Sequence, residues 1–163
     1  MTPINLISTM AKNLREVVKD YKFIAELQNP KPVTVYEQYL PTDRFEDDTF
    51  YPLIIVTCRQ VDFISAKQAK YNGERIATLI LTLGVYGGDK DDGWRDLFNM
   101  AERITQFLAT APILPENYFF NRPVLEGKFV LEKFPVFEPL AEQPEPFYFG
   151  NILTQYQLAA PVF

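Results

Sequence analysis

Clustered carboxylates are the residues of this sequence with the clearest capacity for chemistry. In the cluster Asp89, Asp91 and Asp92, the first two residues have the spacing of the first two ligands in a calcium-binding loop. The rest of that pattern requires a third ligand at the position of Gly93 and a bidentate glutamate at the position of Met100, so the calcium motif fails. The aspartates precede a helical segment, where acidic side chains favour the start of a helix. We therefore predict helix capping here rather than a metal site.

A second acidic pair, Asp47 and Asp48, could perform acid–base work of the glycosidase type if its carboxyl groups faced each other across a cleft. The surrounding residues, 42–50, have little apolar content and are predicted to form an exposed acidic loop. Such a loop holds two carboxyl groups too loosely for catalysis. An enzyme that depends on carboxylates stays an alternative hypothesis.

The composition removes most other catalytic chemistries. Histidine is absent, so the sequence lacks the usual general base at neutral pH and the commonest transition-metal ligand. Cys58 is the only cysteine, which excludes an intramolecular disulfide, a CxxC pair and a cysteine-based zinc site. Gly84, Gly87 and Gly88 follow a predicted strand but fit neither phosphate-binding glycine motif. We predict that the chain is not an enzyme and takes no cofactor or metal.

Charge and aromatic content point to protein partners rather than to nucleic acid. Sixteen basic residues stand against 21 acidic ones, a balance opposite to that of proteins that grip DNA by releasing counterions. The aromatic share of 15% is high, and aromatic side chains carry much of the energy of interfaces as well as of cores. The sequence shows no signal peptide and no apolar run long enough to span a bilayer, so we expect no membrane association.

Two segments have the apolar spacing of amphipathic helices. Residues 3–20 begin with Pro3, which suits the first helical position, and residues 92–110 end before Pro112. In the second segment Trp94 is in phase with Leu97 and with later apolar residues, which predicts that Trp94 packs in the core; a partner contact is the alternative.

Five segments have the residue content of strands. They are residues 33–40, 53–58, 74–86, 129–134 and 149–158. The second is apolar on both alternating faces, as in a strand covered on two sides, and is expected to pair with the third. The order of helix, three strands, helix and two strands predicts an α+β fold, with two main helices packed against a mostly antiparallel sheet of about five strands. We predict a single domain over residues 1–163.

Two further features are predicted to form interfaces. Residues 60–73 make a hairpin loop much longer than usual, with Phe63, Ile64 and Tyr71 as apolar anchors in a polar frame. These side chains would contact a neighbour or, as the alternative, fold back onto the domain. The consecutive aromatics Phe147, Tyr148 and Phe149 cannot all point to one side of a strand, so at least one should face away from the domain's own core.

Four blocks of the sequence resemble, in the same order, blocks of the tail terminator (tail completion) proteins of tailed bacteriophages. They are Tyr-Glu-Gln-Tyr-Leu-Pro at 36–41, Tyr-Pro-Leu-Ile-Ile-Val at 51–56, Asp-Gly-Trp-Arg-Asp-Leu-Phe-Asn-Met-Ala-Glu-Arg-Ile at 92–104 and Pro-Phe-Tyr-Phe-Gly at 146–150. The resemblance covers roughly residues 36–158. The Asp-Gly-Trp-Arg block, joined to the late aromatic strand, is its most specific part.

The resemblance implies a structural virion protein assembled in the cytoplasm of a bacterial host. Its subunits would form a ring, expected to be hexameric, on the head-proximal end of the tail tube, ending tube polymerisation and offering a surface to the head–tail connector or neck protein. Its partners would be copies of itself, the tail tube protein and the connector, and DNA would pass through the ring without specific binding. The alternatives are a neck or head–tail joining protein and, in a different class, a carrier of a small apolar ligand.

Overall fold

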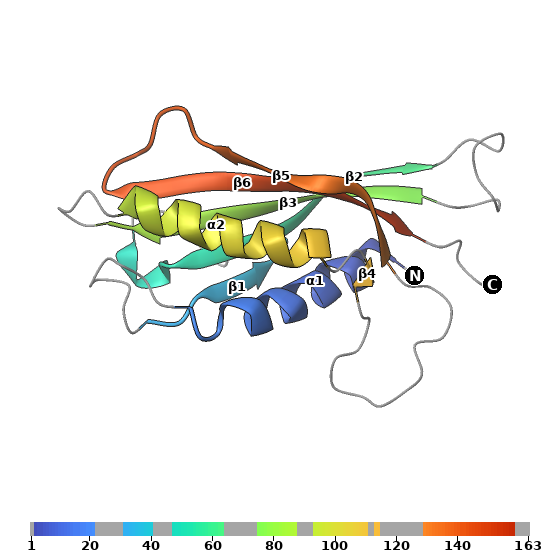
Figure 1. Cartoon of the computed structure of the whole chain (residues 1–163), viewed down its shortest axis with the longest axis horizontal. Coiled ribbons are helices and arrows are strands. Elements are labelled where there is room, and N and C mark those ends of the chain that lie inside the picture. The colour runs from blue at the N-terminus through green and yellow to red at the C-terminus, as the bar shows by residue number, and fades with distance from the viewer. Residues whose placement is uncertain are drawn as a thin grey trace.

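The architecture is a six-stranded sheet with two helices on one of its faces, seen in a computed structural model (Figure 1). The structure describes residues 2–21, 31–40, 47–63, 75–87, 93–110, 113–114 and 129–158. Within these ranges the expected α+β fold, with its mostly antiparallel sheet and two main helices, is confirmed.

The strands follow the order β1-β2-β3-β6-β5-β4 across the sheet. β1 is parallel to β2, and every other pair is antiparallel. β1 and β5 therefore lie toward opposite edges of the sheet (Figure 1). The strand bounds are Thr34–Glu37 for β1, Leu53–Phe63 for β2, Arg75–Tyr86 for β3, Ile113–Leu114 for β4, Phe129–Pro139 for β5 and Phe147–Leu158 for β6.

Helix α1 spans Pro3–Val18 and begins with a reciprocal cap. Thr2 Oγ1 accepts a hydrogen bond from the Asn5 backbone N–H, and Asn5 Oδ1 accepts one from the Thr2 backbone N–H. Pro3 occupies the first turn, where its missing N–H costs nothing. The cap fixes the start of the helix, which packs against β1 and β2.

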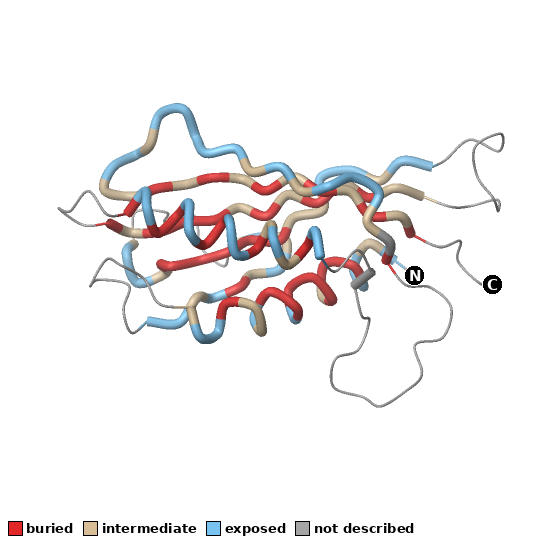
Figure 2. The backbone as a smooth tube through the Cα atoms, viewed as in Figure 1, coloured by how far each residue is buried: buried red, intermediate tan, exposed pale blue. Residues whose placement is uncertain are grey.

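Helix α2, Gly93–Thr110, covers β3, β6 and β5. Both helices press their apolar sides onto the same face of the sheet, where Figure 2 shows the buried residues gathered. Leu79, Leu81 and Leu83 of β3 are fully buried beneath them. Each such leucine contributes roughly 1.5–3 kcal/mol of burial free energy, so this layer is the main source of stability.

The predicted position of Trp94 in the core is wrong. Leu97, Met100 and Ala101 lie beneath the helix, whereas the Trp94 side chain is 44% exposed. At 100° per residue, Trp94 and Phe98 lie roughly 60° and 100° around the helix from Leu97, on the same side of the buried stripe. The sheet covers the middle of the buried stripe and leaves the border that carries Trp94 and Phe98 exposed.

Two strands extend further than the sequence predicts. β2 continues to Phe63 through a register shift between Cys58 and Gln60, so residues 60–63 belong to a strand and not to the predicted hairpin loop. Residues 60–63 belong to the sheet because β3 pairs with them as far as Arg75. β5 passes Pro135 and ends at Pro139, because an edge strand with register shifts tolerates residues that lack an N–H.

Candidate interaction surfaces

The aromatic residues Phe147, Tyr148 and Phe149 divide between the two faces of β6, as their alternation predicts. Tyr148 is buried in the main core, beside Gly87 and Gly93. It presents little surface to a partner. Phe147 and Phe149 point to the opposite face, the one that the helices leave uncovered.

Phe147 and Phe149 join a second apolar cluster at one end of the uncovered face. The ring centroids of Tyr51 and Phe147 are 4.9 Å apart, and those of Tyr51 and Phe149 are 5.8 Å apart. A side chain at Gly84 would come within 2.9 Å of both Phe149 and Tyr51, so glycine lets the two rings lie over β3. Both phenylalanines are half-buried, which makes this cluster chiefly a structural plug with an exposed rim.

A third group of aromatics lies between α2 and the outer strand β5. Trp94 and Phe98 pack edge to face with ring centroids 6.0 Å apart, and Phe98 meets Phe137 of β5 in the same way at 5.3 Å. Trp94 and Phe98 are each 44% exposed. The Arg95 guanidinium carbon lies 5.1 Å from the centre of the Trp94 ring, which fixes one side of that ring.

Further exposed apolar side chains occur in β5 and in the turn after it. Phe134 is 69% exposed and Leu140 is also exposed. Val136, exposed as well, instead lies with Thr78 and Leu153 on the face that the helices leave uncovered. Figure 2 shows most of β5 and the following turn as exposed. We use the name β5-side surface for the packed rings of Trp94, Phe98 and Phe137 together with the exposed Phe134 and Leu140 of β5 and its turn. An apolar area of this kind often marks a protein interface.

At the opposite edge of the sheet, Tyr39 stands out beyond β1 with 76% of its surface exposed. It follows Gln38, whose φ of 66° is the only positive value at a non-glycine residue in the described ranges. The Gln38 side chain accepts a hydrogen bond from the Cys58 backbone N–H at 3.0 Å, and its own backbone N–H donates to the Val56 carbonyl at 2.7 Å. The turn is thus fixed to β2 and holds Tyr39 outward.

The candidate hairpin residues divide between what the structure describes and what it does not. Phe63 ends β2, pairs with Arg75 of β3 and is 74% exposed. Ile64 and Tyr71 lie outside the described residues. Phe63 is therefore a separate exposed apolar residue at the end of the antiparallel pair of β2 and β3, which we call the β2–β3 ribbon.

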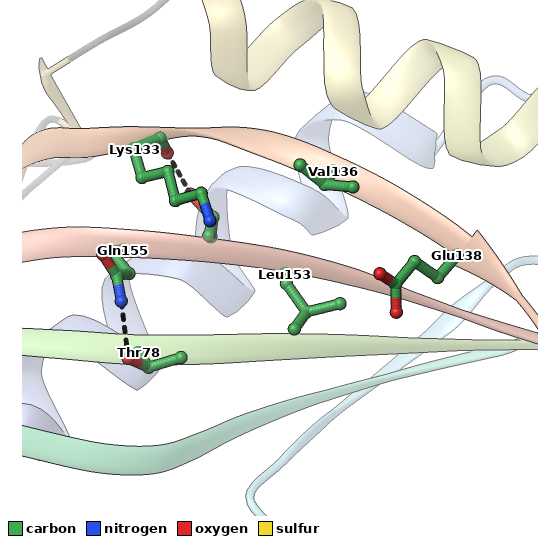
Figure 3. A pocket seen from close by; sticks show the side chains of 7 residues that line it. Thr78, Lys133, Val136, Glu138, Leu153 and Gln155 are labelled. Atoms are coloured by element: carbon green, nitrogen blue, oxygen red, sulfur yellow. Dashed lines mark hydrogen bonds between the residues drawn. The ribbon is translucent and has the colours of Figure 1, made fainter.

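The middle of the uncovered face carries neutral polar side chains that bond to one another across strands. Gln155 Nε2 donates to Thr78 Oγ1 at 3.2 Å, as Figure 3 shows. A shallow cavity of about 120 Å³ lies here, with Lys133 and Glu138 at its rim. Typical small-molecule sites measure roughly 300–1,000 Å³, so this cavity does not favour a ligand carrier.

The described residues offer little to a metal ion. No three His, Cys, Asp or Glu side chains gather there in a group that could hold one. Burial raises the pKa of the Cys58 thiol, and a hydrogen bond with the Gln60 backbone partly opposes the rise. In the same part of the chain, neither helix is long and apolar enough to cross a membrane.

The sequence found part of these surfaces and missed part. Local sequence predicts exposed side chains at Phe63, Phe147 and Phe149, because an apolar residue in a polar stretch and three consecutive aromatics are recognisable patterns. The β5-side surface depends on how α2 is rotated against the sheet, and the Tyr39 turn depends on hydrogen bonds to β2. Neither arrangement has a signature in local sequence.

No protein-family model and no curated protein matches the chain.

Proposed function

We propose that this chain is a tail terminator subunit, which forms a ring on the head-proximal end of a phage tail tube. The ring ends tube polymerisation and offers its outer surface to the connector or neck protein. The sequence blocks that resemble this family include the Trp94 helix, which forms part of the β5-side surface. The proposal thus joins the sequence resemblance to a surface of the fold.

One structural observation carries the proposal: exposed aromatic side chains occur at three separate places. Tyr39 lies by β1, the β5-side surface lies by the opposite edge, and Phe63 lies at the end of the β2–β3 ribbon. Four strand spacings separate β1 from β5, a distance of roughly 19 Å. One subunit therefore cannot join these places to each other.

A ring subunit that stacks on a tube needs at least this number of contacts. Head-to-tail association uses two different patches, one for each neighbour, and it closes into a ring when its rotation does. A third surface is then required along the ring axis. We assign the first two roles to the Tyr39 turn and the β5-side surface, and the axial role to the Phe63 end.

The charge of the molecule agrees with a conduit for DNA. The net charge is −5, and the middle of the uncovered face bears hydroxyl and amide groups such as those of Thr78, Thr82, Asn151 and Gln155. A wall with these properties attracts no phosphate backbone and lets DNA pass without specific binding.

Electron microscopy of particles assembled without this protein tests the function. Overlong tails would support a terminator, because nothing would stop tube growth. Tails of normal length that lack heads would instead indicate the alternative, a neck or head–tail joining protein. Normal, complete particles would overturn both assignments. Restoring the intact chain in trans is the control, and it should return tails to normal length.

A further inference from the structure

We propose that the Tyr39 turn of one subunit docks on the β5-side surface of a second copy, and that this is the repeated contact of the ring. The inference rests on the proposed function and adds which surfaces meet. It identifies Tyr39 as the inserted side chain, and Trp94 and Phe98 as the main contacts that receive it.

The turn before Tyr39 is held in a costly conformation, which favours a binding role. A non-glycine residue with φ near 66° costs about 1–3 kcal/mol and persists only where its surroundings enforce it. Four hydrogen bonds between Gln38 and β2 enforce it here, including one from Thr57 Oγ1 to the Gln38 carbonyl at 3.2 Å. The exposed tyrosine is therefore fixed before any partner arrives, which lowers the entropy cost of binding.

The receiving surface has the composition of an interface centre. Tyrosine and tryptophan are enriched among residues that dominate binding energy, and such residues tend to pair with their like on the partner. Trp94 and Phe98 are already packed against each other, and Phe137 supports Phe98 from β5. Their half-exposed rings offer edges and faces to a further aromatic ring at little cost in side-chain entropy.

Charge complementarity identifies the occupant as a second copy of this chain. α1, which packs beside β1, has more basic than acidic groups on its outer side, whereas β5 and its turn are mainly acidic. On the α1–β1 side the charged groups are Lys12, Arg15, Lys19 and Lys31 against Glu16, Asp20 and Glu37. Around the β5-side surface they are Glu132, Glu138, Glu142 and Glu145 against Lys133 and Arg95, so the two sides still differ in sign. Head-to-tail contact brings the basic side of one subunit to the acidic side of the next.

The contact is made by side chains rather than by continuing the sheet. β1 has only four residues, and its Val35 carbonyl already accepts a hydrogen bond from Arg15 Nη2 at 3.0 Å. On the other side of the sheet, β5 pairs with β4 only at residues 129 and 130, and its open remainder contains Pro135 and Pro139, which have no N–H to donate. Neither edge is suited to adding a strand.

Substitution of the exposed tyrosine tests the inference. Light scattering over a concentration series, with and without tail tubes, measures the association of intact chains. Tyr39→Ala should raise the concentration for half-association by about tenfold, the value of one strong interface residue. Ile4→Ala is the matched control, because Ile4 is 73% exposed and lies outside both surfaces; it should leave association unchanged. An equal effect of both variants would overturn the inference.

Crosslinking then tests which surfaces meet. In a Cys58→Ser background, Tyr39→Cys and Phe98→Cys chains are assembled separately and as a mixture under oxidising conditions. A disulfide dimer that forms only in the mixture supports the contact. Association of the mixed variant chains themselves, measured by light scattering, without this crosslink overturns the contact but leaves the ring proposal standing. A parent chain that stays monomeric even with tail tubes overturns both, which keeps the two failures distinguishable.

Discussion

Among single residues, two tyrosines have phenol groups that the fold keeps neutral far into the alkaline range. Burial raises the pKa of Tyr21 to about 12; the Asp96 carboxylate adds to the rise and the Arg103 guanidinium opposes it. Burial also raises the pKa of Tyr156, which lies within the main core. Both residues therefore connect folding to ionisation at high pH.

The stability of the molecule should fall in alkali because of these groups. The folded-state pKa of Tyr21 exceeds its ordinary value of 10, so the unfolded chain releases the phenol proton first as pH rises. The contribution of Tyr21 to the free energy of unfolding should stay constant below about pH 9 and decrease between pH 10 and 12. Denaturant unfolding at a series of pH values measures this decrease.

The Tyr21→Phe variant provides the comparison, since it keeps the ring that stacks beside Arg103. Its unfolding free energy should decline less steeply above pH 10 than that of the parent chain. Identical slopes for the two proteins would contradict the assignment. Salt added at pH 7 should not reproduce the difference, because both phenols are neutral there.

At the scale of elements, helix α2 has two sides with different roles. Leu97 is fully buried against the sheet, whereas Trp94, three residues earlier, is 44% exposed on the β5-side surface. The sequence predicts one apolar stripe on this helix, because three-four spacing cannot separate the middle of a stripe from its border. Only the position of the sheet against the helix determines which apolar residues of the stripe are buried and which are exposed.

Two substitutions in α2 should therefore separate stability from association. Leu97→Ala should lower the free energy of unfolding by about 2–5 kcal/mol, as for a buried leucine that leaves a cavity. Trp94→Ala should cost less, about 1–2 kcal/mol, and should weaken association by at least tenfold. Thermal unfolding and light scattering measure the two effects. A Trp94→Ala protein as unstable as Leu97→Ala, with unchanged association, would return Trp94 to a structural role.

The strands show what could be predicted from sequence and what could not. Residues 53–56 of β2 are apolar on both faces and are buried on both, because the helices cover one face and the Tyr51 cluster covers part of the other. Because residues 60 and 62 are polar, the local sequence carries no signal that β2 continues beside β3. Likewise Pro135 suggested the end of β5, and its place on an edge strand was not visible locally.

For the whole molecule, the place where β2 and β3 meet gives a direct test of the axial contact. Phe63 and Arg75 face each other as the last pair of the ribbon, so a short glycine-containing turn can replace residues 64–74. The shortened protein should keep its melting temperature, since the described core lies elsewhere. It should fail to limit tail length, which electron microscopy measures against particles made with the intact chain.

Other outcomes of this deletion carry different meanings. Normal tail length with a shortened, folded protein would discard a role for these residues in contacting the tube. Loss of folding would favour the alternative in which Ile64 and Tyr71 pack back onto the domain. Phe63→Ser in the intact chain then decides whether the exposed end of β2 contributes by itself, because that change removes no residue from the ribbon.

The prolines of β5 also bear on the pool of free subunits that must exist before assembly. A long free edge strand is a template for uncontrolled fibre growth, and Pro135 and Pro139 interrupt the row of donors that such growth would need. Subunits can then accumulate to high concentration without forming cross-β aggregates. We accordingly expect variants that lose the Tyr39 contact to remain dispersed in solution rather than to precipitate.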